Sequence, residues 1–269
     1  MKIAILLTGQ LRTFNMVKYL HLNTLISQYN SDVFLSIDLD NSLQCINKNK
    51  KTKSNINDAN EAIRFFKPKG VFILENFNPE FNRINKKNPF VPQNVKLLFE
   101  QYYIVKNAYN LMLQHMKKTN TTYDIIIRLR FDQFIWTNET FSIFQNINKK
   151  VSQIMYNKVN IDKLNKLSKG KKIVFGPTLN NNIYLLNFGR FRNYNYSYAN
   201  DQFWYHNPHL TNKIYNFYDN LPQLLYQSIK ENKGNRGALI EHLWYRYITT
   251  NKINMNKGRV KGVFVREFN

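Results

Sequence analysis

Two arginines and an aspartate, spaced two residues apart, follow a run of isoleucines near the middle of the chain, where residues 123–132 read YDIIIRLRFD. Side chains at i, i+2 and i+4 of a strand lie on one face, so the spacing predicts that Arg128, Arg130 and Asp132 point together. Charges beside so apolar a strand need a partner, a metal or a ligand. The pattern suits a phosphorylated ligand, bound by the arginines or through a metal on the aspartate. A structural ion pair at the end of a sheet is the alternative.

A glycine turn after the first apolar run is the second candidate. Residues 3–7 form a continuous apolar run, typical of a central parallel strand, and Gly9, Gln10 and Arg12 follow before an amphipathic stretch over 14–26. In an open α/β sheet such a turn lies at the carboxyl edge, where a helix N-terminus and Arg12 would attract phosphate. An ordinary turn between strand and helix is the alternative. Neither GxGxxG nor GxxxxGK[ST] occurs in the sequence, which excludes a dinucleotide fingerprint and a P-loop.

These residues require a sheet to position them, and the first half of the chain alternates strand and helix patterns. The expected elements after the first helix are a strand at 32–37, a helix at 57–66, a strand at 70–74, an irregular loop at 76–93, a helix at 95–117 and the strand at 123–132. This order predicts a mostly parallel sheet of nucleotide-binding type, flanked by helices.

The second half has a less regular pattern. Short strands are expected at 172–176, 183–186 and 262–266, an aromatic segment at 201–205, and helices at 208–220 and 237–249. A regular half followed by an irregular half suits an enzyme that binds a nucleotide with one part and an acceptor with the other. We therefore expect one domain over 1–269, with a nucleotide-binding half at 1–137 and an acceptor half at 138–269.

The chain is strongly basic, with 39 lysines and arginines against 17 acidic residues among 269 and a formal net charge of +22. Such an excess favours an acidic partner, such as a nucleotide, a nucleic acid or an anionic membrane surface. Much of the excess lies in Lys/Asn-rich stretches of the kind that an AT-rich genome also produces without selection for binding.

Cysteine usage and hydropathy favour a cytoplasmic protein with at most peripheral membrane contact. Cys45 is the single cysteine, which excludes an internal disulfide framework and a cysteine zinc site. The apolar start is too short for a signal peptide, and no window approaches the roughly 20 apolar residues of a spanning helix.

Four segments together resemble a known family. They are Thr8-Gly9-Gln10-Leu11-Arg12-Thr13, Ile127-Arg128-Leu129-Arg130-Phe131-Asp132, Ala199-Asn200-Asp201-Gln202-Phe203 and Ala238-Leu239-Ile240-Glu241-His242-Leu243. In this order, over nearly the whole chain, they resemble glycosyltransferases of the A-type fold (GT-A), and more closely the families of polysaccharide and lipopolysaccharide synthesis. The resemblance implies a GT-A-like fold and the transfer of a sugar from a nucleotide-sugar donor to a glycan or other surface-polymer acceptor.

The resemblance also assigns roles to the residues of the first half. The turn of Gly9, Gln10 and Arg12 would bind the nucleotide, Arg128 or Arg130 would neutralise the diphosphate, and Asp132 would bind a divalent cation, Mn²⁺ or Mg²⁺. The sequence supplies one carboxylate where the family's Asp-x-Asp motif has two, so metal dependence is open. A literal Asp-Leu-Asp at 38–40 stands in the wrong place for that motif and is interpreted as a turn or a nucleotide-side loop.

Two acids of the second half are candidates for catalysis. Asp201 is the candidate base of an inverting reaction, because an acceptor hydroxyl needs a carboxylate to take its proton. Glu241, on an otherwise apolar helix, is the second candidate, and a helix cap or a satisfied helix charge is the alternative for either acid.

Other polar and aromatic residues of the second half are given structural interpretations. His206 and His209 are separated by Asn207-Pro208, and surface histidines are preferred to metal ligands. Aromatic residues around 194–205 could stack on a sugar or a base, with core packing as the default.

The competing function is a non-catalytic, basic nucleic-acid-binding protein, which the net charge motivates. The sequence has no zinc finger, no RNP-like strand and no uninterrupted basic helix, so no specific nucleic-acid partner is expected. A nuclease would require clustered carboxylates, which this chain lacks.

Overall fold

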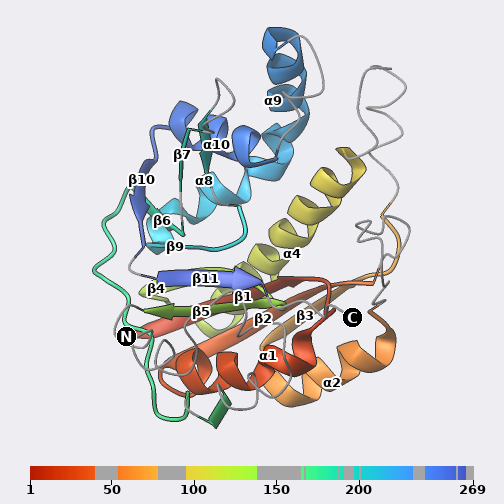
Figure 1. Cartoon of the computed structure of the whole chain (residues 1–269), viewed down its shortest axis with the longest axis vertical. Coiled ribbons are helices and arrows are strands. Elements are labelled where there is room, and N and C mark those ends of the chain that lie inside the picture. The colour runs from red at the N-terminus through yellow and green to blue at the C-terminus, as the bar shows by residue number, and fades with distance from the viewer. Residues whose placement is uncertain are drawn as a thin grey trace, which may run out of the picture.

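The computed structural model of the chain describes residues 1–39, 54–77, 95–137, 165–166, 168–186, 188–190, 197–199, 201–232, 240–258 and 260–264. A central sheet of seven strands has the order β10-β6-β9-β4-β1-β2-β3, and helices cover both of its faces (Figure 1). Most neighbouring strands in it are parallel. The predicted α/β class, with a mostly parallel sheet flanked by helices, is confirmed.

The strands and helices of the first half follow the predicted alternation. The four strands are β1 (Lys2–Gly9), β2 (Asn30–Asp38), β3 (Gly70–Leu74) and β4 (Ile125–Arg130). The helices are α1 (Phe14–His21), which continues as the π-helix η1 (Leu22–Ile26), α2 (Ile56–Phe66) and α4 (Val95–Thr119). β1 pairs in parallel with β2 on one side and with β4 on the other.

Side chains alternate along β1, and each face of the strand contributes to a different core. Ile5 and Leu7 pack with residues of α1 and α2, whereas Ala4 and Leu6 pack with residues of α4, α9 and α10. A strand buried on both faces reads as a continuous apolar run, which explains why the segment could be recognised from the sequence. The two helical layers are visible on opposite sides of the sheet in Figure 1.

The second half extends the same sheet instead of forming a separate layer. Its strands are β6 (Asn182–Leu185), β9 (Trp204–His206) and β10 (Asn254–Lys257), and β9 lies antiparallel between β4 and β6. Two small ribbons pair β5 (Gln133–Thr137) with β11 (Val260–Phe264) and β7 (Phe188–Arg190) with β8 (Ser197–Ala199). The helices are the 3-10 helix η2 (Pro208–Leu210), α8 (Thr211–Tyr215), α9 (Phe217–Asn232) and α10 (Ile240–Thr250).

Three expectations for the second half need correction. Residues 172–176 are not a strand, and Ile173 instead donates a backbone hydrogen bond to the carbonyl of Thr24 at 3.2 Å. The helix expected at 208–220 is divided into η2, α8 and the start of α9. The aromatic segment at 201–205 leads into a strand that joins the two halves. Residues 78–94, most of the predicted irregular loop, and Asp40 lie outside the described residues.

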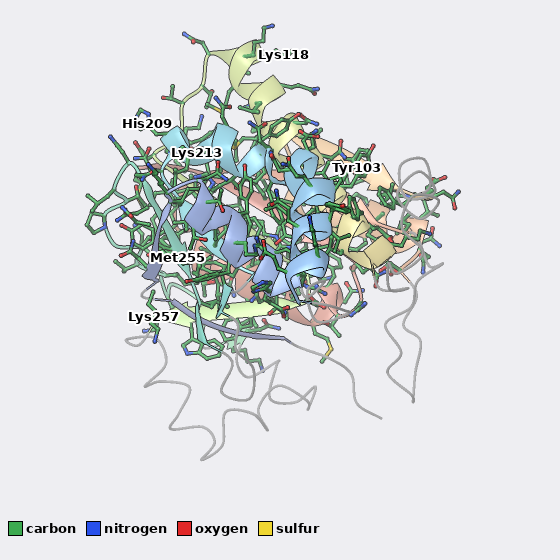
Figure 2. All side chains as sticks on the ribbon, turned by 90° about the horizontal axis from the view of Figure 1, so that it is seen from above. Tyr103, Lys118, His209, Lys213, Met255 and Lys257 are labelled. Atoms are coloured by element: carbon green, nitrogen blue, oxygen red, sulfur yellow. The ribbon has the colours of Figure 1, made fainter. Side chains whose placement is uncertain are left out.

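Lysines contribute to the outer surface at several elements. Lys118 on α4, Lys213 on α8 and Lys257 on β10 are exposed and lie at the periphery in Figure 2. None of the helices within the described ranges has both the length and the apolar composition needed to cross a lipid bilayer.

Helix α2, which follows the second strand, begins at a reciprocal cap. The Asn55 Oδ1 atom accepts hydrogen bonds from the backbone N–H groups of Asn57 at 2.8 Å and Asp58 at 3.1 Å. In return, the Asp58 carboxylate accepts one from the backbone N–H of Asn55 at 3.1 Å. Such a capping box satisfies donors that the first helical turn leaves without partners.

Replacing the cap should therefore destabilise the protein. We expect Asn55→Ala to lower the free energy of unfolding by about 1 kcal/mol, as measured by urea denaturation. The matched control is Asn57→Ala, whose exposed side chain accepts no bond in the cap, and its effect should stay within about 0.5 kcal/mol. Equal losses in the two variants would contradict the assignment of the cap.

Candidate active site

The chain reverses its direction of travel across the sheet between β1 and β4. From β1 it proceeds through β2 to β3 on one side, and then crosses to β4 on the other side. In open α/β sheets, ligands bind in the crevice beyond the carboxyl ends of the strands at such a switch point. Thr8 and Arg130 are paired in the register of β1 and β4, so the glycine turn and the arginines lie at the same end of these two strands.

Gly9 leaves open space beside the backbone at the end of β1. Its φ of 105° is in the region that favours glycine, and no atom lies within 4 Å of the position that a Cβ would take. Beyond it, Leu11 donates its backbone N–H to the Ser54 hydroxyl at 2.8 Å, and Arg12 Nε donates to the Gln10 side-chain oxygen at 2.8 Å. The turn therefore combines open space at Gly9 with the guanidinium of Arg12.

Arg128 is a cation buried at the end of β4, with 1% of its surface exposed. Its Nε donates to Thr8 Oγ1 at 3.0 Å, its Nη1 donates to the backbone carbonyl of Asp201 at 2.5 Å, and its guanidinium lies 4.7 Å from the ring centre of Trp204. None of the described carboxylates forms an ion pair with it. Burial lowers the pKa of Arg128 to about 10, which keeps the group charged at neutral pH.

Arg130 and Asp132 form a two-bond ion pair beside Arg128. Arg130 Nε and Nη2 donate to the two oxygens of Asp132 at 2.8 and 3.0 Å. The Asp132 side chain is completely buried, whereas that of Arg130 is 18% exposed. The structural ion pair that the sequence left open is present, and it holds the Arg130 guanidinium against a buried carboxylate.

The expected metal ligand does not fit this arrangement. Both oxygens of Asp132 bond to Arg130, and a cation at Asp132 would have to displace a guanidinium from a buried position. The described part of the chain contains no group of three or more histidine, cysteine, aspartate or glutamate side chains that could hold a metal ion.

Asp201 is a buried carboxylate with one oxygen hydrogen-bonded and the other without a hydrogen-bond partner. Its side chain is 2% exposed, and Oδ2 accepts a hydrogen bond from Gln101 Nε2 at 2.6 Å. Oδ1 has no hydrogen-bond partner among the described residues. Burial raises the pKa of Asp201, and the charge of Arg128 and the bond from Gln101 oppose that rise.

Glu241, in the first turn of α10, lies close enough to Asp201 for the two charges to interact. Burial, and then the charge of Asp201, raise the pKa of Glu241, which is half-buried. The structure therefore brings together both predicted acids and Arg128. A carboxyl group whose pKa is raised by burial suits proton transfer, and the nearby guanidiniums suit an anion.

Three functional contacts could not be recognised in the sequence. Gln101 on α4 reaches Asp201 across a separation of 100 residues, and Thr8 and Trp204 support Arg128 from β1 and β9. Gln101 lies on an otherwise unremarkable amphipathic helix, and Trp204 is one aromatic among many. No local signal distinguishes these residues, because their contacts are all between distant elements.

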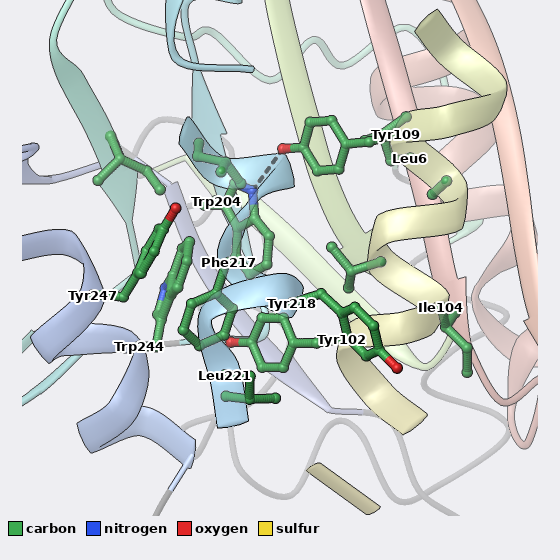
Figure 3. Close-up of a cluster of buried hydrophobic side chains, with 14 of the residues drawn as sticks. Leu6, Tyr102, Ile104, Tyr109, Trp204, Phe217, Tyr218, Leu221, Trp244 and Tyr247 are labelled. Carbon is green, nitrogen blue, oxygen red and sulfur yellow. Dashed lines mark hydrogen bonds between the residues drawn. The ribbon is translucent and has the colours of Figure 1, made fainter. Parts of the chain in front are cut away.

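A chain of buried hydrogen bonds supports Trp204, and Figure 3 shows its first bond, to Tyr109. Trp204 Nε1 donates to the Tyr109 hydroxyl at 3.1 Å, and that hydroxyl contacts His206 Nε2 at 2.7 Å. His206 Nδ1 lies 2.7 Å from the carbonyl of Asn207, which can only accept, so Nδ1 carries the proton and Nε2 accepts from Tyr109. The expectation that His206 lies at the surface is wrong, whereas His209 is exposed. Phe203, Trp204 and Tyr205 are core residues.

A family model described as "Domain of unknown function (DUF7796)" matches residues 1–160, which is more than half of the chain, and the chain belongs to this family. No curated protein matches it in sequence. Among solved structures, the nucleoside-diphosphate-sugar pyrophosphorylase from Vibrio cholerae RC9 aligns over 98% of this chain and 95% of its own, with 11% identity and a TM-score of 0.37. A TM-score of this size does not establish a common fold.

The buried histidine behind Trp204 should make stability depend on pH. Burial lowers the pKa of His206 from 6.5 to about 4, so the unfolded chain binds a proton there that the folded protein does not. The contribution of neutral His206 to the free energy of unfolding is fully present above pH 6.5. It falls by about 1.4 kcal/mol per pH unit as the pH decreases from 6.5 toward 4. His206→Gln should be less stable than the parent at pH 7.5, and the difference should shrink as pH decreases to 5.

Urea denaturation at several pH values measures this difference. The control is His209→Gln, at an exposed histidine three residues away, which should track the parent at every pH. A constant difference between His206→Gln and the parent from pH 7.5 to 5 would show that His206 does not titrate in this way.

Proposed function

We propose that this member of the DUF7796 family is a glycosyltransferase of the A-type fold, which transfers a sugar from a nucleotide-sugar donor to a glycan acceptor. The observation that carries the proposal is the placement of Asp201: a buried carboxylate whose Oδ1 has no hydrogen-bond partner among the described residues, next to Arg128, which donates to the Asp201 carbonyl. A transferase of this kind needs an anion site and a proton acceptor a short distance apart.

The donor would bind at the carboxyl edge, with its diphosphate over the turn that begins at Gly9. The open backbone there admits phosphate oxygens, and Arg12 and the exposed part of Arg130 supply positive charge. Arg128 is too deeply buried to be the main diphosphate ligand, and its bond to the Asp201 carbonyl gives it a positioning role instead.

In the reaction, the acceptor hydroxyl would attack the anomeric carbon of the donor sugar. The Asp201 carboxylate takes the hydroxyl proton, a new glycosidic C–O bond forms, and the bond to the diphosphate breaks so that the nucleoside diphosphate leaves. Developing charge on the leaving diphosphate is stabilised by the arginines of the crevice. Glu241 stands near enough to be the alternative base.

Two further expectations remain predictions. A divalent cation that accompanies the donor diphosphate would have to be held without Asp132, so donor binding should be compared with and without manganese. Contact with an anionic membrane would use exposed lysines such as Lys118, Lys213 and Lys257.

The donor site makes a direct prediction for Arg12. Losing one charge-assisted contact costs about 1.5 to 3 kcal/mol, so Arg12→Ala should weaken the binding of a nucleoside diphosphate about tenfold or more in calorimetry. The control is Arg64→Ala, at an exposed arginine on α2, which should bind as the parent does. If no nucleoside diphosphate or nucleotide-sugar binds the parent protein, the proposed function is wrong.

The proposed base makes a separate prediction. Asp201→Asn keeps the shape of the side chain and removes its basicity, so donor affinity should be retained while turnover falls roughly 10²–10⁴-fold. Asp219→Asn, at a surface acid that bonds to Lys106, is the control and should retain full turnover. An active Asp201→Asn would assign the base to Glu241, or would favour a retaining reaction without an enzyme base.

A further inference from the structure

Most strands of the central sheet begin at one edge, which we call the amino edge. β1, β2, β3 and β4 run parallel, β6 and β10 run parallel to each other, and β6 has the direction of β4 because both are antiparallel to β9. The proposed donor site lies beyond the other ends of β1 and β4. The amino edge is therefore a separate surface of the molecule.

Exposed lysines follow the amino edge across the width of the sheet. They lie in or near the segments that lead into β3, β4, β6 and β10, and we call them the lysine edge: Lys67, Lys69, Lys117, Lys118, Lys213 and Lys252. Lys213 belongs to it because its Nζ atom donates to Asn181 Oδ1 at 3.3 Å and to the carbonyl of Asn251 at 3.4 Å, just before β6 and β10. In Figure 2, Lys118 and Lys213 lie toward the top of the view, and Lys257, at the carboxyl end of β10, lies toward the bottom.

Carboxylates at the amino edge do not cancel this charge. Asp32, near the start of β2, is 7% exposed and lies 3.3 Å from Lys2 Nζ and 3.9 Å from Lys69 Nζ. The exposed Asp124 accepts the backbone N–H of Lys2 at 2.6 Å. Other described acids end or follow β2, β3 and β4 at the opposite edge, and they are Asp38, Glu75 and Asp132. Within the described ranges, the amino edge therefore has more cations than carboxylates.

The width of the lysine edge and an exposed leucine beside it favour a membrane over a nucleic acid. β3 and β10 are the outermost strands, so the edge spans six interstrand spacings of about 4.8 Å, about 29 Å in all, whereas a nucleic acid is bound in a groove that follows its backbone. Leu179 is 61% exposed in the turn before β6, where its carbonyl accepts the N–H of Asn182 at 3.1 Å. A leucine side chain has no partner on a phosphate backbone, but it can enter the boundary between lipid headgroups and acyl chains.

We propose that the lysine edge and Leu179 together bind the surface of an anionic lipid membrane. Among the exposed lysines named above for such a contact, this inference retains Lys118 and Lys213 and excludes Lys257, which lies at the other end of its strand. The inference does not depend on the proposed reaction. It orients the molecule, because the carboxyl edge with its turn at Gly9 then faces away from the lipid, toward a nucleotide-sugar in solution.

The test is co-sedimentation of the full chain with lipid vesicles at physiological salt, where charges more than about 8 Å apart are largely screened. The parent should sediment with vesicles of equal parts phosphatidylserine and phosphatidylcholine, and not with vesicles of phosphatidylcholine alone. Lys117→Ala/Lys118→Ala should weaken this binding about 25-fold, because each lysine near an anionic surface contributes about fivefold in affinity. The matched control, Lys230→Ala/Lys257→Ala, removes the same charge from α9 and from the carboxyl end of β10, and it should bind as the parent does.

Leu179→Ser tests the apolar contact separately. Burial of a leucine side chain contributes about tenfold in affinity, so this variant should bind the mixed vesicles about tenfold more weakly. Its control is Tyr226→Ser, at a 59% exposed tyrosine on α9, which should bind as the parent does. The melting temperatures of all variants should stay near that of the parent, because the replaced side chains are exposed.

The inference is wrong if the parent sediments equally with both kinds of vesicle or with neither. It is also wrong if the two lysine pairs weaken binding equally, because the net charge of the whole chain would then attract the lipid. If the parent binds an oligonucleotide but not the vesicles, and Lys117→Ala/Lys118→Ala weakens that binding, the lysine edge is a nucleic-acid surface instead. None of these measurements contains a donor, so their failure leaves the proposed function to its own tests.

Discussion

The burial of one guanidinium, that of Arg128, organises this protein. A charge removed from water at the end of a central strand is tolerated only if nearby groups replace its hydration. Here the replacements come from three distant parts of the sequence: the Thr8 hydroxyl on β1, the carbonyl of Asp201 and the ring of Trp204 on β9. Satisfying this cation therefore requires the first strand, the fourth strand and the second half of the chain to meet at one point.

That requirement explains how the two halves share one sheet. β9 inserts between β4 and β6, with Trp204 paired to Arg128 in the register, and so continues the sheet across the boundary between the halves. Asp201 stands just before β9 and is brought to the crevice by the same pairing. Its carboxylate accepts a hydrogen bond from Gln101 of α4, and its charge acts on Glu241 of α10. The pairing of β9 with β4 thus positions both Asp201, the proposed proton acceptor, and Trp204, which lies against Arg128.

Much of this fold could be predicted from the sequence, because its signals are local. The apolar runs of β1 and β4 and the turn at Gly9 are predicted from continuous apolar residues and from a glycine that follows them. The pairing of Thr8 with Arg130 then brings this turn and the arginines to the same end of the two strands. The partners of the charges were harder to predict. Arg128 donates to Thr8 across 120 residues, and His206 contacts Tyr109 across 97 residues, and no local pattern reveals either contact.

The central claim is that a nucleoside diphosphate binds in the crevice at the carboxyl ends of β1 and β4. Hydrogen–deuterium exchange of the full chain, with and without a nucleoside diphosphate or nucleotide-sugar, measures this directly, because a bound ligand slows the exchange of amides that it covers or rigidifies. The account predicts slower exchange in residues 9–12 and 130–132. Slower exchange confined to the opposite edge of the sheet, at residues 121–124, would contradict it.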